Sequence, residues 1–232
     1  MDFSIVVPAY NEEKTIKKCL NALFKLKYPK NKYEVIVVNN NSTDQTKNIV
    51  KSYKNVTFLN EYKQGISFAR QKGLNFAKGK YYISIDADTV LPINYLQKAT
   101  SIINKHPNAA CIFGPVMAQN YYKIVCNIIY FSTIAVGFIT KHIYNCNAIY
   151  NTKILKKYGG FSTKYKYFED GIITAKFKKT KQKIIFSKNL KAFISIRRYK
   201  GLKALSIFKN LFNYYYYYYF NKIPFKKMDP LR

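Results

Sequence analysis

Residues 81–88, Tyr81-Tyr82-Ile83-Ser84-Ile85-Asp86-Ala87-Asp88, decide how the rest of this sequence is interpreted. The run 81–85 is short and mostly apolar, which predicts a buried strand. Asp86 and Asp88 follow it at once. Two carboxylates separated by one residue can share a hard divalent cation that already carries other oxygen ligands. Because Asp-x-Asp pairs are also common in solvated loops, it is the preceding strand that favours a cation site.

Three more strands are expected before this stretch, with helices between them. Short apolar runs predict strands over 4–7, 33–38 and 56–59. Helices are expected after Asn11, whose side chain would cap the first one, after Asp44, and over 68–77. Strands that alternate with helices form a parallel sheet with crossover connections, so this half of the chain indicates an α/β fold.

Polar clusters follow three of these strands: Tyr10-Asn11-Glu12, Asn39-Asn40-Asn41 and Asp86-Ala87-Asp88. Ligands of open α/β sheets bind at the carboxyl ends of the strands, so the three clusters are expected to share one binding edge. Tyr10 offers a flat face for a base, Glu12 an acceptor for base or ribose, and an Asn amide can pair with a base edge. The structural alternative is that Asn11, Glu12 and Asp44 only begin helices.

The pattern changes after Pro115. Residues 124–139 are largely apolar but short for a membrane span, which favours a core or partly buried helix over an interfacial one. Strands are expected over 148–150, 183–186 and 192–196, and a helix over 153–158. Glu169 and Asp170, two of only three acids in the last 112 residues, open another helix. A carboxylate among lysines stays ionised and suits a general base, although acids also favour a helix start without any ligand.

The composition excludes a disordered chain and leaves the partner open. The chain has 232 residues, 48% of them hydrophobic, and a net charge of +29. Residues 121–232 hold 23 Lys and Arg against 3 acids, which indicates an anionic partner or a compositional bias toward lysine. Four cysteines without CxxC spacing predict no zinc site and suit a reducing compartment. The start of the sequence lacks a signal-peptide pattern, so a cytoplasmic location is expected.

The last part of the sequence is basic and aromatic. Residues 199–220 place apolar side chains at helical spacing among lysines and end in the tyrosine run 214–219. This pattern suits a basic amphipathic helix lying on an anionic membrane, at its inner face, and equally a terminal helix packed on the domain. Arg197 and Arg198 follow an expected strand, where they would contact a diphosphate or be solvated.

Together, these motifs resemble family 2 glycosyltransferases with the GT-A fold. The matching stretches, in order, are 5–13, 37–44, 65–73, 77–79, Asp86-Ala87-Asp88, Gly159-Gly160-Phe161 and Glu169-Asp170-Gly171. The resemblance implies a mostly parallel, Rossmann-like sheet flanked by helices. It divides the chain into a nucleotide-sugar-binding half (1–115), an acceptor-binding half of the same domain (116–196) and a basic, Tyr-rich C-terminal helix or tail (197–232).

The resemblance also implies a reaction. A family 2 enzyme moves a sugar from a nucleoside diphosphate to a hydroxyl of a glycan or lipid-linked glycan, with inversion, as in the biosynthesis of cell-surface polysaccharides. Asp88 would hold Mg²⁺ or Mn²⁺ with the donor diphosphate, and Asp86 would face ribose and metal. Asp170 would be the catalytic base, with Glu169 supporting the acceptor.

Further positions would line the nucleotide-sugar pocket. Asn40 would meet the base; the family often has Asp there, so the identity of the base stays open. Gly65 and Arg70 would belong to the segment that closes over base and ribose. The full expected set is Pro8, Ala9, Tyr10, Glu12, Asn40, Gly65, Arg70, Asp86, Ala87, Asp88 and Arg198.

Two other classes of function compete with this one. A nucleic-acid-binding protein would explain the charge, but the acids at three strand ends would repel phosphate. A catalytically inactive relative that only binds sugar nucleotides would not need Asp88 and Asp170, both of which are present.

Overall fold

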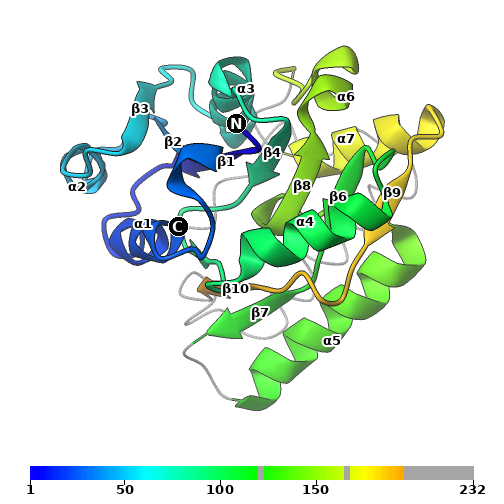
Figure 1. Cartoon of the computed structure of the whole chain (residues 1–232). Coiled ribbons are helices and arrows are strands. Elements are labelled where there is room, and N and C mark those ends of the chain that lie inside the picture. Colours follow the sequence, from blue (N-terminus) through cyan, green and yellow to red (C-terminus); the bar gives the residue numbers. More distant parts are fainter. Residues whose placement is uncertain (120–122, 165–167, 196–232) are drawn as a thin grey trace.

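The computed structural model describes residues 1–119, 123–164 and 168–195 (Figure 1). Arg198, the expected helix over 199–220 and the rest of the expected segment 197–232 lie outside these residues. Within them, a central sheet is covered by helices on both faces, and a smaller sheet lies between it and the long helix α5.

The strands expected in the first half form one part of the central sheet. Their spatial order is β3-β2-β1-β4 and all their pairings are parallel: β1 (Phe3–Ala9), β2 (Tyr33–Asn39), β3 (Val56–Asn60) and β4 (Tyr81–Ser84). β1 is buried along its whole length, as a strand covered on both faces requires. The prediction of a mostly parallel sheet in an α/β fold is confirmed.

The second half of the chain completes this sheet. β8 (Ala148–Asn151) pairs antiparallel with β4 and with β6 (Cys111–Phe113), and β9 (Ile184–Phe186) pairs parallel with β6. The order of the seven strands is β3-β2-β1-β4-β8-β6-β9. Strands from before and after residue 115 therefore share one sheet.

A second, three-stranded sheet extends from the acid pair. It consists of β5 (Thr89–Val90), which directly follows Asp88, β10 (Ala192–Ser195) and β7 (Val116–Gln119), in the order β5-β10-β7. β10 pairs antiparallel with β5 and parallel with β7. The expected strand at 192 is confirmed as far as Ser195. β5, β6 and β7 are not expected from the sequence, because strands of two to four residues are too short to display a period.

Helices cover both faces of the central sheet. One face packs on α1 (Ile16–Phe24), α2 (Thr46–Lys51) and α4 (Tyr95–Lys105). The opposite face packs on α3 (Ile66–Phe76), α6 (Thr152–Lys157) and α7 (Glu169–Lys179). Ile5 and Val7 of β1 enter the first core and Val6 enters the second, because successive side chains of a strand point to opposite faces.

One predicted helix cap is wrong. α1 begins at Ile16, and Asn11 has a φ of 54°, in the left-handed region that asparagine tolerates. Its Oδ1 accepts a hydrogen bond from the Thr43 N–H at 2.8 Å, so the side chain joins the loop after β1 to the loop after β2. Asp44 does act at a helix start, since its carboxylate accepts from the N–H of Thr46 at 2.9 Å.

The helix α4 is not expected from the sequence, although its buried residues follow helical spacing. The hydroxyl of Tyr95 donates to Oδ1 of Asn147 at 2.7 Å. Asn147 belongs to the 3₁₀ helix η2 (Asn145–Asn147), and its Nδ2 donates to the carbonyls of Pro115 and Leu190 at 3.0 and 2.7 Å. One buried amide thus joins α4 to the segments that lead into β7 and β10.

The long helix α5 (Lys123–Thr140) packs on β7 of the second sheet. A further 3₁₀ helix, η1 (Lys30–Lys32), precedes β2. In the described part of the chain, no helix has both the length and the apolar character that crossing a membrane requires. The expected helix over 124–139 is confirmed, since α5 contains all of these residues.

Candidate functional site

The three polar clusters lie at one edge of the central sheet. β2, β1 and β4 are neighbours and parallel, and Ala9 at the end of β1 is in register with Asn39 at the end of β2. The loop that carries Asp86 and Asp88 leaves β4 at the same edge (Figure 1). The three clusters therefore lie together, as expected. Their proximity follows from the parallel order of the strands, which brings the carboxyl ends of β2, β1 and β4 to one edge.

The cluster after β1 is built into the fold. Pro8 and Ala9 are buried in the strand, while Tyr10 is partly exposed. The buried Glu12 donates its N–H to the hydroxyl of Thr46 at 2.7 Å, and its carboxylate accepts from the hydroxyl of Thr15 at 2.6 Å. These bonds hold the entrance of α1 against the start of α2.

The cluster after β2 controls the next loop. Asn40 is buried, and its Nδ2 donates to the carbonyls of Glu61 and Lys63 at 2.9 and 2.8 Å. Its Oδ1 accepts from the N–H of Gly65 at 2.8 Å. Gly65 has a φ of 142°, which favours glycine, and it immediately precedes α3. Asn40 therefore fixes the loop that leads to α3, which bears Arg70.

The loop after β4 carries the acid pair. The N–H of Asp86 donates to the hydroxyl of Thr89 at 3.3 Å, and the N–H of Thr89 donates back to the carbonyl of Asp86 at 3.0 Å. Ala87 is buried between two partly exposed acids, so the turn keeps both Asp86 and Asp88 at the surface of the site. Beneath it, the thiol of Cys19 lies 3.8 Å from the carbonyl of Asp86.

A single buried guanidinium joins this loop to the second half of the chain. Arg70 is 1% exposed. It donates through Nη2 to Oδ1 of Asp86 at 2.5 Å, through Nη1 to Oε1 of Glu169 at 3.0 Å, and through Nε to the hydroxyl of Ser84 at 3.3 Å. Burial alone would lower the pKa of Arg70. Glu169 and Asp86 raise this pKa by more than burial lowers it, so the guanidinium stays charged. The resemblance assigns Arg70 to the segment that closes over base and ribose, which stays a prediction, and the guanidinium itself binds Asp86 and Glu169.

Glu169 is the buried member of its acid pair. Besides Arg70, its Oε1 accepts from Nδ2 of Asn145 at 3.2 Å, and the hydroxyl of Tyr150 donates to Oδ1 of Asn145 at 2.5 Å. Burial raises the pKa of Glu169 to about 6, with Arg70 lowering it and Asp170 raising it. Glu169 therefore anchors α7 to the core.

Asp170 is the more accessible acid, with 24% of its side chain exposed. Its Oδ1 accepts from the N–H of Gly171 at 2.8 Å, and Oδ2 lies 4.0 Å from Nε2 of the buried His142. Phe168, just before the pair, has a φ of 74°, a strained conformation for an aromatic residue. The Phe168 ring occupies the space that a Cβ on Gly171 would need, which explains the glycine of the Glu169-Asp170-Gly171 motif.

The two acid pairs share one electrostatic environment. Burial raises the pKa of the Cys146 thiol well above its ordinary value, and Asp86, Asp88 and Asp170 add to that shift while Arg70 opposes it. All three carboxylates therefore act on one point between the halves of the chain. Among the described residues, four acids lie around one buried guanidinium, an arrangement that suits an additional cation.

The donor set fits a metal ion held jointly with a ligand. Among the described residues, no group of three or more His, Cys, Asp or Glu side chains could hold a metal by itself. Mg²⁺ is often bound by one or two carboxylates plus substrate phosphates. Asp86 keeps 38% of its side chain exposed although Arg70 binds one of its oxygens, and Asp88 is partly exposed. These two carboxylates suit an ion that arrives with a diphosphate.

Sequence reasoning missed several residues of this site. Asn145, Ser84 and Cys146 lie around the buried carboxylates, and His142 lies beside Asp170. The only signal was a polar run, Asn145-Cys146-Asn147, directly before a buried strand. Arg198, also expected in the site, lies outside the described residues.

Comparison with known protein families identifies a match over most of the chain. The family described as Glycosyl transferase family 2 matches residues 4–159. This range covers the strands β1 to β4, both acids of the Asp86/Asp88 pair and the Gly159 end of the Gly159-Gly160-Phe161 motif.

Individual relatives match shorter stretches. The poly(ribitol-phosphate) β-N-acetylglucosaminyltransferase TarS of Staphylococcus aureus is 38% identical over 111 residues, covering 46% of this chain and 19% of that protein. A dolichyl N-acetyl-α-D-glucosaminyl phosphate 3-β-D-2,3-diacetamido-2,3-dideoxy-β-D-glucuronosyltransferase of Methanococcus voltae is 26% identical over 173 residues, covering 66% and 54%. The chain thus spans about a fifth to about half of the length of these curated relatives.

A solved structure extends the similarity to the fold. The crystal structure of residues 1–349 of S. aureus TarS in complex with UDP-GlcNAc superposes with a TM-score of 0.68 at 25% identity. The alignment covers 85% of this chain and 59% of that one. The expectation of a GT-A fold is confirmed.

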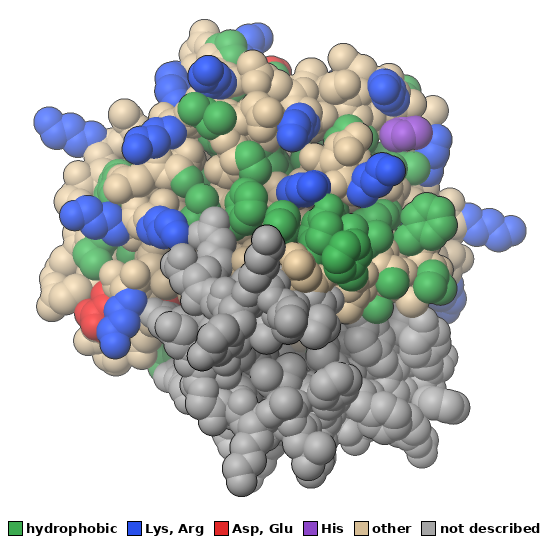
Figure 2. Space-filling model, turned by 90° about the horizontal axis from the view of Figure 1, so that it is seen from below, with side chains coloured by type: hydrophobic (Ala, Val, Ile, Leu, Met, Phe, Trp, Pro, Cys, Tyr) green, Lys and Arg blue, Asp and Glu red, His purple; other side chains and the backbone are tan. Residues whose placement is uncertain are grey.

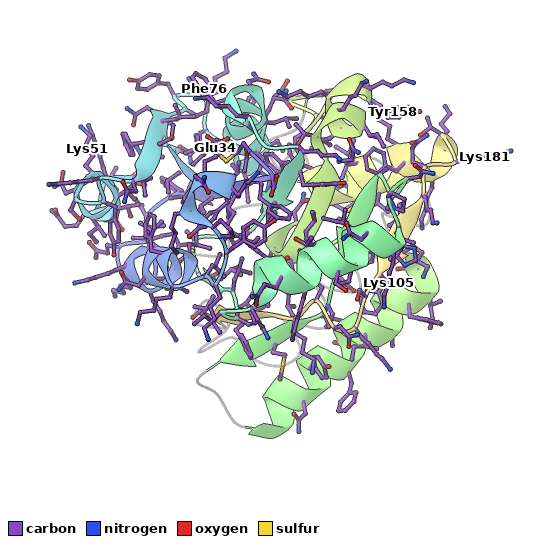
Figure 3. All side chains as sticks on the ribbon, viewed as in Figure 1. Glu34, Lys51, Phe76, Lys105, Tyr158 and Lys181 are labelled. Atoms are coloured by element: carbon purple, nitrogen blue, oxygen red, sulfur yellow. The ribbon has the colours of Figure 1, made fainter. Side chains whose placement is uncertain are left out.

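We predict that Arg70→Met destabilises the protein by about 3–5 kcal/mol, because it leaves two carboxylates facing the core without their partner. Arg70→Lys should recover little of this, since one ammonium does not reproduce the forked geometry. Chemical denaturation measures both. Lys105→Met, an exposed position at the end of α4 (Figure 3), is the control and should change stability by less than about 0.5 kcal/mol. Equal midpoints for Arg70→Met and Lys105→Met would contradict the bridging role.

A second prediction concerns His142. Burial lowers its pKa to about 3, with Lys178 contributing. The unfolded chain therefore takes up this proton near pH 6.5 while the folded chain does not, so stability should fall as the pH drops from 6.5 toward 3, by about 1.4 kcal/mol per pH unit from this group. Glu169 acts in the opposite direction between about pH 4.5 and 6, because its folded-state pKa is raised.

Comparison of variants isolates the histidine. His142→Phe should show a weaker loss of stability on acidification than the wild type, measured by urea denaturation at a series of pH values. Phe76→Leu, an exposed change on α3 that adds or removes no titratable group, should retain the wild-type slope. If His142→Phe and the wild type lose stability in parallel, the histidine is not the group that takes up the proton.

Proposed function

The chain belongs to glycosyl transferase family 2, and on that basis we propose that it transfers a sugar from a nucleoside diphosphate sugar to an acceptor hydroxyl, with inversion at the anomeric carbon. The acceptor is a glycan or a lipid-linked glycan of the kind used to build cell-surface polysaccharides. The observation that carries the proposal is the pairing of Asp86 and Glu169 on one guanidinium, which brings the two acid pairs into a single site.

The donor occupies the edge where β1, β2 and β4 end. Pro8, Ala9 and Tyr10 line the side of the nucleotide, and Glu12 and Asn40 shape that wall through the loops they hold. Ala87 separates the two acids, and Asp86 is left with an exposed oxygen for ribose or metal. Asp88 and Asp86 would hold Mg²⁺ or Mn²⁺ together with the diphosphate. Such an ion, when bound, neutralises the charge that develops on the departing nucleoside diphosphate.

Asp170 accepts the proton of the attacking hydroxyl. It is the exposed acid of its pair, so an acceptor can reach it, whereas Glu169 is buried against Arg70 and Asn145. An in-line displacement needs the base on the side opposite the leaving group. In this arrangement Glu169 and Arg70 are positioning residues.

The relatives support a nucleotide sugar as donor. TarS is known as an N-acetylglucosaminyltransferase and its structure holds UDP-GlcNAc, while the M. voltae relative is named for a dolichyl phosphate-linked acceptor. The stretch shared with TarS is short, and Asn40 stands where the family often has Asp. We therefore propose a nucleoside diphosphate sugar as donor and name no particular sugar or linkage.

We predict that Asp170→Asn lowers kcat by roughly 10²–10⁴-fold, the usual contribution of a general base, and changes the donor KM only a few-fold. Release of nucleoside diphosphate from a panel of nucleotide sugars, with and without acceptor, measures both constants. Asp88→Ala should instead weaken donor binding and abolish the response to Mn²⁺.

The matched control is Asp2→Asn. Its carboxylate accepts from the hydroxyl of Tyr28 at the opposite end of β1, away from the proposed site, so activity should stay near the wild-type level. Full activity in Asp170→Asn would place the base elsewhere. Metal-independent transfer in the wild type would remove the role proposed for Asp88.

A further inference from the structure

The outward side of α5 is apolar. Phe131, Phe138 and Ile139 are 63, 68 and 78% exposed, and Ala135 between them is also exposed. These positions are spaced i, i+4, i+7 and i+8, so they lie on one face of the helix. Seen from below the view of Figure 1, where α5 is the lowest helix, hydrophobic side chains gather on the surface, and lysines lie along the described side of this patch (Figure 2).

The size of this apolar stripe is unusual for a surface that meets only water. Two phenylalanines and an isoleucine exposed to this degree present on the order of 400 Å² of apolar area. Contiguous apolar patches of several hundred Å² on soluble proteins generally mark a binding surface. A helix that only completed a core would instead carry polar side chains on this face.

The charge around the stripe is positive. Nζ of Lys141 lies 5.0 Å from the ring centroid of Phe138, and Nζ of Lys191 lies 5.1 Å from that of Tyr130. The sequence contains no Asp or Glu over 89–168 or 171–228, so α5, β6, β7, β9 and β10 contribute no acid to this side. An apolar stripe with a basic border complements the anionic headgroups and acyl boundary of a bilayer.

The inner side of α5 fixes its position relative to the site. The hydroxyl of Thr133 lies 3.4 Å from both backbone polar atoms of Val116 in β7, and a Cβ on Gly137 would meet the ring of Phe186 at 2.6 Å. β7 pairs with β10, and β10 pairs with β5, which begins directly after Asp88. The strand pairing β7-β10-β5 therefore connects the strand on which α5 packs to the loop that carries the acid pair.

We propose that the outer face of α5, formed by Phe131, Ala135, Phe138 and Ile139, is a membrane-docking surface that lies in the headgroup region of an anionic bilayer. The helix lies along the membrane, in keeping with its length and with the lysines beside it. Docking in this way holds the acid site close to the membrane surface, where a lipid-linked acceptor presents its hydroxyl. The surface itself does not depend on the proposed sugar transfer.

Vesicle co-sedimentation of the full chain tests this proposal. The protein should bind vesicles of phosphatidylcholine mixed with phosphatidylglycerol more tightly than vesicles of phosphatidylcholine alone. The Phe131→Ser/Phe138→Ser double variant should bind the anionic vesicles at least tenfold more weakly. The control is Phe76→Ser on α3, which is 51% exposed on the opposite side of the molecule (Figure 3) and should bind like the wild type.

Further measurements separate this surface from the catalytic site. Both altered side chains point to solvent, so circular dichroism should show an unchanged fold, and activity on a soluble acceptor should be unchanged. Equal vesicle binding by the double variant and the wild type would overturn the proposal, as would wild-type protein that binds neither vesicle. A wild-type dimer that the double variant no longer forms would also overturn it, by assigning the face to a second copy of the chain.

Discussion

The two halves of the site are held together by the buried guanidinium of Arg70. It pairs with Asp86, which follows a strand of the parallel sheet, and with Glu169, which begins α7 and lies 99 residues after Arg70 in the sequence. Burying a charge is costly unless partners and hydrogen bonds compensate for it, and here two carboxylates and the hydroxyl of Ser84 do so. Neither acid loop can shift without leaving a charge unpaired in the core. The geometry of the site therefore depends on this contact.

The contact with Arg70 also explains why the four acids have different roles. Asp86 and Glu169 each accept a hydrogen bond from Arg70 through one carboxylate oxygen. Each is followed closely by a second, partly exposed acid that can meet a ligand. Asp88 lies beyond the buried Ala87, at the surface of the loop, and Asp170 lies at the exposed start of α7. In the proposed reaction, one pair faces a donor with its ion, and the other faces an acceptor. Among the described residues, the carboxylates at this site outnumber the one guanidinium, which gives a reason for a divalent ion at the first pair.

Much of this arrangement was predictable, for identifiable reasons. Apolar runs disclosed β1 to β4, and parallel order then required Tyr10, Asn40 and Asp86 to meet at one edge. Arg70 was placed near the base and ribose by the family resemblance alone. Its burial could have been predicted, because it shares a helix face with Ser67 and Leu74, at spacings of three and four, on the buried side of α3. Asn145 and His142 were missed because their partners lie on β8 and α7, and no local pattern encodes such contacts. β5 to β7 are too short to show a period.

The central claim is that Asp88 faces the donor and its ion while Asp170 stands across from it on the acceptor side. Anomalous scattering from crystals grown with a nucleoside diphosphate and Mn²⁺ tests this most directly. We expect one manganese peak within coordination distance of the Asp88 carboxylate and the diphosphate, with Arg70 still bound to Asp86 and Glu169. A nucleotide bound without manganese at Asp88, or manganese coordinated by Asp170, would contradict it.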